Sequence, residues 1–258
     1  MSKRRDWFLV LCLLLPSLLV NATAAPLPKK IILATTDWCP YACPGDPQTP
    51  GIAHEYITQV LADLGVDVEI KFYPWSRAIR EVSLGRSHGL LTAVHDEAPD
   101  FLFTRTPTMA YSMCFFSKQT KDWEYMGIKS LEAIRFGGIK GYGYSPEING
   151  YMEYDNSQTR VELISGGNEI PRLFQMIKHG RIDAFIEDKY VVAWSAKKNS
   201  VDMQDFKKAG CLKEIPFFMA FNPDFPWVMN VLKQLDSSFL AAKNKTILKR
   251  IVERYTGY

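Results

Sequence analysis

The chain has 258 residues, of which 47% are hydrophobic and 23% charged, and its formal net charge is +3. A nearly neutral protein offers no electrostatic reason to bind nucleic acid or an anionic membrane surface, so the sequence gives no support to either function. The length permits one large domain or two smaller lobes.

Residues 1–24 have the pattern of a secretory signal peptide. The basic head Lys3-Arg4-Arg5 precedes an apolar run from Trp7 to Val20, and an Ala-x-Ala end follows. We place cleavage after Ala24; an uncleaved N-terminal anchor is the alternative. No later segment approaches the ~20 apolar residues of a membrane span. We therefore expect a soluble mature protein that is exported, with a periplasmic location.

The mature chain opens with strands and helices in alternation. The apolar patterns predict strands at 30–35, 66–72 and 89–94, and helices at 52–64 and 75–84. The Pro-, Gly- and Asp-rich segment 37–50 is a predicted loop. This βαβαβ series is typical of an α/β lobe with parallel strands.

A second α/β series follows residue 111. Strands are predicted at 111–116, 136–139, 161–164, 182–186 and 214–221, and helices near 130–134 and at 148–154, 168–179, 191–200, 225–240 and 245–255. The last two helices are expected to return to the first lobe. The predicted lobes are therefore 26–114 plus 218–258, and 115–217, joined by crossing strands near 111–117 and 214–221 that would form a hinge.

Two segments 95 residues apart support this repeat. Each has an amphipathic helix, a Gly-Arg pair at Gly85-Arg86 or Gly180-Arg181, and then a buried strand. A glycine just past the last helical turn supplies the left-handed residue that ends a helix. Only arginine and glycine are identical between the two segments, so they indicate a repeated fold and no shared chemistry.

Four cysteines follow the signal peptide, and an even number favours disulfides in an oxidising compartment. Cys39 and Cys43 flank a turn-like spacer, so a local bridge is plausible there, and Cys114 with Cys211 then follows by elimination. A metal site is the alternative, but the four histidines are scattered. We expect no metal and no cofactor.

Aromatic residues gather where the two lobes should meet. Loops at the carboxyl ends of strands line the ligand crevice of open α/β sheets, and aromatic walls with a few placed charges hold small polar ligands. The candidates for ligand binding are Trp38, Tyr41, Trp75, Arg77, Tyr111, Tyr142 and Tyr144. Some of these side chains could equally belong to the core or to the rim.

Motifs for catalysis are scarce. The sequence has no Gly-x-Ser-x-Gly element, and its glycine-rich stretches match neither phosphate-binding pattern. His95, Asp96 and Glu97 are the candidates for an acid/base group, with an exposed acidic loop as the alternative. We expect a protein that is not an enzyme.

The order of the elements resembles family 3 of the bacterial periplasmic solute-binding proteins, the polar amino-acid binding components of ABC transporters, in a divergent branch. The similarity covers nearly all of residues 30–256. It rests on the stretches Asp37-Trp-Cys-Pro-Tyr41, Gly51-Ile-Ala-His-Glu-Tyr, Pro74-Trp-Ser-Arg-Ala78, Leu84-Gly-Arg-Ser-His-Gly, Phe103-Thr-Arg-Thr-Pro and Gly180-Arg-Ile-Asp-Ala-Phe-Ile-Glu-Asp188. The resemblance implies an α/β, two-lobed periplasmic-binding-protein-like fold of type II, with two crossing hinge strands and the ligand between the lobes.

The resemblance also assigns two site positions. The family's aspartate for the ligand ammonium falls on Asp188, which could instead, or in addition, cap the following helix. The family's arginine clamp for the carboxylate should lie between Val94 and Phe103, where this chain has no arginine, and His88 replaces a usual aspartate. The ligand, an amino acid or a related compound, therefore stays open.

We therefore expect an exported monomer that captures a small polar ligand for the membrane permease of an ABC importer. A dehydratase-like enzyme on the same scaffold is one alternative. A ligand sensor that acts through a separate membrane partner is another.

Overall fold

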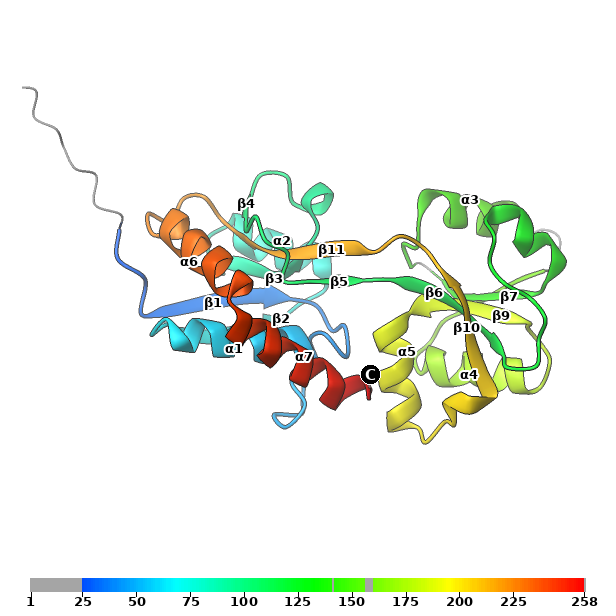
Figure 1. Cartoon of the computed structure of the whole chain (residues 1–258). Helices are drawn as coiled ribbons and strands as arrows, with labels where there is room; N and C mark the ends of the chain where they lie inside the picture. Colours follow the sequence, from blue (N-terminus) through cyan, green and yellow to red (C-terminus); the bar gives the residue numbers. More distant parts are fainter. Residues whose placement is uncertain (1–24, 141, 156–159, 258) are drawn as a thin grey trace, which may run out of the picture.

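A computed structural model of the protein describes residues 25–140, 142–155 and 160–257. The predicted signal peptide lies outside the described residues. The chain forms two lobes, each built on its own mixed β-sheet, that lie end to end in an elongated molecule (Figure 1). No helix in the described part of the chain is long and apolar enough to cross a bilayer.

The first lobe contains a sheet in the order β2-β1-β3-β11-β4, with β5 paired to the start of β11. Its strands are β1 (Lys30–Thr35), β2 (Asp67–Phe72), β3 (Gly89–Ala93), β4 (Leu102–Phe103), β5 (Met109–Tyr111) and β11 (Ile215–Phe221). Strand β1 is parallel to β2 and β3, so their carboxyl ends lie at one edge of the sheet.

Helices cover both faces of this first sheet. One face packs against α1 (Ile52–Asp63), α6 (Val228–Leu240) and α7 (Ala242–Thr256), and the other against α2 (Trp75–Ser83). Successive residues of β1 explain this arrangement, because Leu33 packs with the first group and Ala34 with α2. The buried strands thus read as nearly continuous apolar runs.

The second lobe contains a sheet in the order β10-β6-β9-β7-β8. Its strands are β6 (Met113–Lys118), β7 (Phe136–Ile139), β8 (Val161–Ile164), β9 (Ala184–Asp188) and β10 (Phe206–Cys211). Its α-helices are α3 (Pro146–Asp155), α4 (Glu169–Lys178) and α5 (Lys189–Lys198), and it also has two short 3₁₀ helices, η2 (Ile128–Ala133) and η4 (Met203–Asp205). A further 3₁₀ helix, η1 (His95–Glu97), belongs to the first lobe, between β3 and β4. Phe185 faces α4 and α5, whereas its neighbour Ile186 faces α3.

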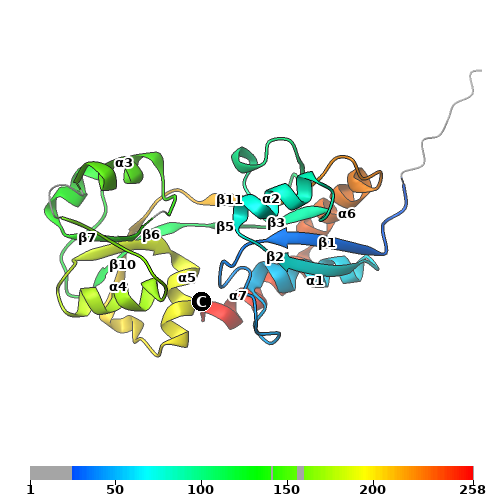
Figure 2. The ribbon, with the colours of Figure 1, turned by 180° about the vertical axis from the view of Figure 1, so that it is seen from behind.

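The chain passes between the two sheets twice. The first crossing is Ser112, between β5 and β6, and the second is the segment 212–214, between β10 and β11. Both crossings run side by side in the two views of the molecule, and the end of α7 meets α5 beside them (Figures 1 and 2). Disulfides join Cys39 to Cys43 and Cys114 to Cys211. The second bridge links neighbouring strands β6 and β10 just past the crossings.

Helices α2 and α4 end in the way their sequences predict. Gly85 and Gly180 follow the C-cap residues, with φ of 67° and 65°, a conformation that glycine adopts without strain. Three residues later, Nδ1 of His88 accepts a hydrogen bond from the backbone N–H of Ile32 at 2.8 Å. The carboxylate of Asp183 accepts one from the N–H of Arg135 at 2.8 Å. Two different side chains thus tie the same kind of turn to a neighbouring strand.

Candidate functional site: a cavity between the lobes

A cavity of about 390 Å³ lies between the lobes. Its walls combine loops that follow parallel strands of both sheets, because the carboxyl ends of β1, β3 and β7 all open toward it. The first lobe contributes Thr36, Asp37, Trp38, Trp75, Thr92, Val94, Glu97, Tyr111 and Phe217, and the second contributes Met113, Tyr142 and Gly143. Trp38, Trp75, Tyr111 and Tyr142, four of the predicted site residues, are therefore brought together.

The aromatic wall is built around Trp38. Its indole lies 4.2 Å from the ring of Tyr41, and 5.4 Å and 5.6 Å from the rings of Tyr111 and Phe217, measured between ring centroids. The last two contacts are edge-on, a favoured geometry for aromatic pairs. The backbone N–H of Trp38 donates to Ala42 at 2.9 Å, so the Cys39–Cys43 disulfide closes a compact turn that fixes the indole.

Two carboxylates face the cavity, from Asp37 and Glu97. Both side chains remain exposed to solvent. Partial burial raises the pKa of Asp37 above its ordinary value. Partial burial also raises the pKa of Glu97, opposed by a hydrogen bond from the backbone N–H of Val94. Of the three residues considered as acid/base groups, Glu97 alone lines the cavity; His95 packs between Phe103 and Phe218.

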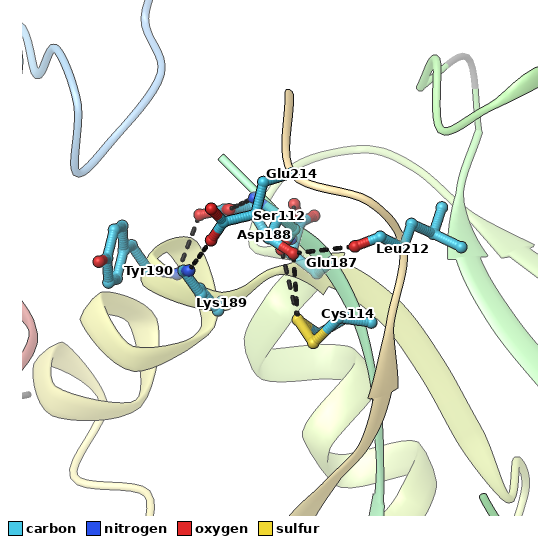
Figure 3. The surroundings of a disulfide bond; sticks show 9 residues. Ser112, Cys114, Glu187, Asp188, Lys189, Tyr190, Leu212 and Glu214 are labelled. Atoms are coloured by element: carbon cyan, nitrogen blue, oxygen red, sulfur yellow. Dashed lines mark hydrogen bonds and ion pairs between the residues drawn. A yellow bond between two sulfur atoms is a disulfide. The ribbon is translucent and has the colours of Figure 1, made fainter. Parts of the chain in front are cut away.

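Asp188 does not line the cavity, and its carboxylate is fully buried. It accepts hydrogen bonds from the N–H groups of Tyr190 and Val191 at 2.9 and 3.1 Å, which caps α5. It also accepts from the N–H of Ser112 and from the hydroxyl of Tyr41, both at 2.9 Å. Figure 3 shows Asp188 with Ser112 and Tyr190 beside the Cys114–Cys211 disulfide. Burial raises the pKa of Asp188, and the four donors oppose that shift.

Tyr41 and Tyr144 are buried under the cavity wall. Tyr41 reaches across to Asp188, and the hydroxyl of Tyr144 accepts the N–H of Ile139 at 2.7 Å. Arg77 lies on the exposed face of α2, with its guanidinium 5.0 Å from the ring centroid of Tyr73 and 3.7 Å from the carboxylate of Glu81. As direct ligand contacts, Tyr41, Arg77, Tyr144 and Asp188 stay a prediction.

One buried acid beneath the cavity was not foreseen. Glu187 is completely buried in β9, and its Oε1 accepts the N–H of Asp188 at 2.8 Å. Its Oε2 has no hydrogen-bond partner among the described residues. Burial raises the pKa of Glu187 to about 8, and the nearby charges of Asp188 and Glu169 add to the effect. The only signal in the sequence is an acidic pair at the end of an apolar strand. The described residues contain no cluster of three or more potential metal ligands.

Comparison with known proteins gives a fold and no sequence family. Neither a family model nor a curated protein sequence matches the chain. Among solved structures, substrate binding domain 2 of GlnP from Lactococcus lactis, in an open conformation, is similar with a TM-score of 0.66 and 15% identity, over 91% of this chain and 98% of that one. ArgBP from T. maritima gives a TM-score of 0.60 and 15% identity, over 89% of this chain and 96% of that one.

A third structure comes from a different functional class. The sensor domain of a histidine kinase, described as similar to periplasmic binding proteins, has a TM-score of 0.61 and 13% identity, over 89% of this chain and 96% of that one. These likenesses span nearly the whole chain at identities too low to transfer a ligand. Together with the two sheets and the double crossing, they confirm the predicted fold: the chain is an α/β protein with the two-lobed, type II architecture of periplasmic binding proteins.

Proposed function

We propose that this protein is an exported solute-binding protein, a divergent member of family 3, that captures a small polar ligand and delivers it to the permease of an ABC importer. The observation that carries the proposal is the cavity between the lobes, which takes its wall from both sheets. A ligand seated there touches Trp38, Trp75 and Tyr111 of one lobe and Tyr142 of the other. The similarity of the fold to transporter substrate-binding domains supports this role.

Capture would work by a change in the relative position of the lobes. A ligand that contacts both lobes binds the closed arrangement better than the open one, and so shifts the population toward closure. The two crossings between the sheets are short enough to act as the hinge. The lobe bounds predicted from the sequence, 26–114 plus 218–258 and 115–217, are part of this proposal. By membership of the two sheets, the second lobe begins at Met113 with β6 and the first lobe resumes at Ile215 with β11.

Two features support export. Both disulfides require an oxidising compartment, which cytosolic proteins generally lack. The leader at residues 1–24 has the signal-peptide pattern described above. A periplasmic location and a permease partner follow from the proposal and are part of it.

Ligand sensing is a second candidate, because one similar structure is the sensor domain of a histidine kinase. In that case a separate membrane protein would read the closed form of this chain. An enzyme is less favoured by the geometry, since Glu97 has neither His95 nor Asp96 beside it on the cavity wall. Incubation with a bound ligand, followed by chromatography for product, would reveal turnover.

The proposal is tested by ligand-induced thermal shift. The protein is screened against amino acids, amines, sugars and small organic acids, and X-ray scattering then measures whether a hit makes the molecule more compact. Trp75→Ala should weaken the hit about ten-fold or more, since a half-buried indole is a large contact. Trp227→Ala is the matched control, because that indole stacks on Phe225 in the first lobe, outside the cavity. A screen without any hit, or equal losses in the two variants, would refute the proposed site.

A further inference from the structure

The charged groups on the cavity wall are all acidic. Asp37 and Glu97 face the cavity, and none of the described lining residues is lysine, arginine or histidine. Glu97 also belongs to the segment between Val94 and Phe103, where the resemblance would place an arginine for a ligand carboxylate. At that part of the wall the chain therefore presents a negative charge in place of a positive one.

Two cations near the cavity, Arg77 and Lys189, lie outside its lining. Arg77 lies on the outer face of α2, against Tyr73 and Glu81. Lys189 has its ammonium 2.6 Å from the carboxylate of Glu214. Both side chains are engaged outside the cavity lining.

The pKa values of the wall tyrosines respond to the nearby acidic groups. Partial burial raises the pKa of Tyr142, and the neighbouring carboxylates Glu187, Glu169, Asp37 and Asp188 raise it further. Burial likewise raises the pKa of Tyr111, with added contributions from Glu97 and Asp188. A ligand carboxylate placed beside Asp37 and Glu97 would be repelled, and the repulsion would grow as water leaves a closing cavity.

We propose that the ligand of this cavity is a small organic ammonium ion that carries no carboxylate, held over the faces of Trp38, Trp75 and Tyr142 and paired with Asp37 and Glu97. The inference rests on the proposed function of the cavity and names its ligand class. Aromatic faces attract a cation through their quadrupole, most strongly for tryptophan. Ionised carboxylates add charge-assisted contacts. Both features disfavour a free amino acid, whose α-carboxylate would have no cationic partner on this wall.

Calorimetric titration with four probes tests the ligand class. Choline and putrescine represent quaternary and primary ammonium ions, 3,3-dimethyl-1-butanol is the neutral isostere of choline, and glycine betaine replaces its alcohol by a carboxylate. We expect binding of at least one cation, and at least ten-fold weaker binding of the neutral isostere and of the betaine. Asp37→Asn and Glu97→Gln should each weaken the bound cation about five-fold or more, whereas Asp67→Asn, on an exposed strand start, should leave it within two-fold.

The outcomes separate this inference from the function on which it rests. If an amino acid or another carboxylate binds and the cations do not, the ligand class is wrong and the binding role stands. A neutral isostere that binds as well as choline also overturns the ligand class, and this comparison in the wild-type protein needs no variant to fold. If no compound from the cation probes or the solute screen binds, the proposed function itself fails.

Discussion

Removing the Asp188 carboxylate should destabilise the protein far more than removing an ordinary helix cap. Asp188→Ala deletes a cap worth about 1 kcal/mol. It also leaves the Tyr41 hydroxyl and the Ser112 N–H without their buried acceptor, at about 1–3 kcal/mol each. The variant no longer has the free-energy cost of burying the Asp188 carboxylate, so the expected loss lies toward the lower end of that sum. We expect the free energy of unfolding to fall by about 3–5 kcal/mol.

The control is Asp202→Ala, because Asp202 caps η4 through a single hydrogen bond, to the N–H of Gln204 at 2.9 Å, on the surface. This variant should lose about 1 kcal/mol. Urea unfolding at pH 7 with both disulfides intact, followed by circular dichroism, gives the two differences. Tyr41→Phe isolates the bond between the lobes and should cost about 1–2 kcal/mol. The reasoning is refuted if Asp188→Ala is no more destabilising than Asp202→Ala.

Three further predictions concern charge and covalent structure. Because the pKa of Glu187 is about 8 in the folded protein, well above its unfolded value, the folded protein holds a proton that the unfolded protein releases, and the free energy of unfolding should fall by a few kcal/mol from pH 5 to pH 8. Thermal unfolding of Glu187→Gln over the same pH range should show a smaller decline, and an identical decline would contradict this prediction. Replacing Cys114 and Cys211 by alanine should lower the free energy of unfolding by about 2–5 kcal/mol, more than replacing Cys39 and Cys43, because the first bridge spans 97 residues and the second only 4. Equal losses in unfolding under non-reducing conditions would argue against a chain-entropy effect. Choline, whose charge is independent of pH, should bind more weakly at pH 4.5 than at pH 7, because partial burial raises the pKa values of Asp37 and Glu97, so more of both carboxylates is protonated at pH 4.5. Calorimetry at both pH values, with the neutral isostere as control, measures the affinity of choline, and an unchanged affinity would contradict the role of these carboxylates.

The first lobe shows what local pattern can predict. Strand β1 and helix α1 begin and end within a residue or so of their expected positions, because β-branched runs and helical spacing are unambiguous there. Strand β10 was missed. Its sequence Phe-Lys-Lys-Ala-Gly-Cys has only two of six residues buried, and Gly210 interrupts it with a φ of 133°. The strand is specified by its pairing with β6, which no short window of sequence contains.

Some residues of the site could be predicted from the sequence and others could not. Trp38 and Tyr142 could be predicted because they follow strands whose carboxyl ends must meet at one edge of a sheet. The burial of Asp188 and Tyr144 could not, because it depends on hydrogen bonds to residues of other elements. Asp37 also lines the cavity from the loop after β1, but it was not singled out there, whereas Phe217 lies inside a predicted strand without any distinguishing signal. Arg77 lies two positions after Trp75 on α2, where a helix turns its side chain to another face, so it lies outside the cavity lining and its contact with a ligand stays a prediction.

The Cys114–Cys211 bridge restricts how the lobes can move. It joins β6 and β10 close to the points where each strand leaves the second sheet, and the N–H of Leu212 donates to the carbonyl of Met113 at 2.8 Å beside it. Sliding one crossing past the other would strain a covalent bond, whereas rotation about an axis through both crossings would not. Because the bridge holds the two crossings at a fixed spacing on the second lobe, we expect the lobes to move mainly by rotation about an axis through both crossings, which a pair of labels, one on each lobe, would detect.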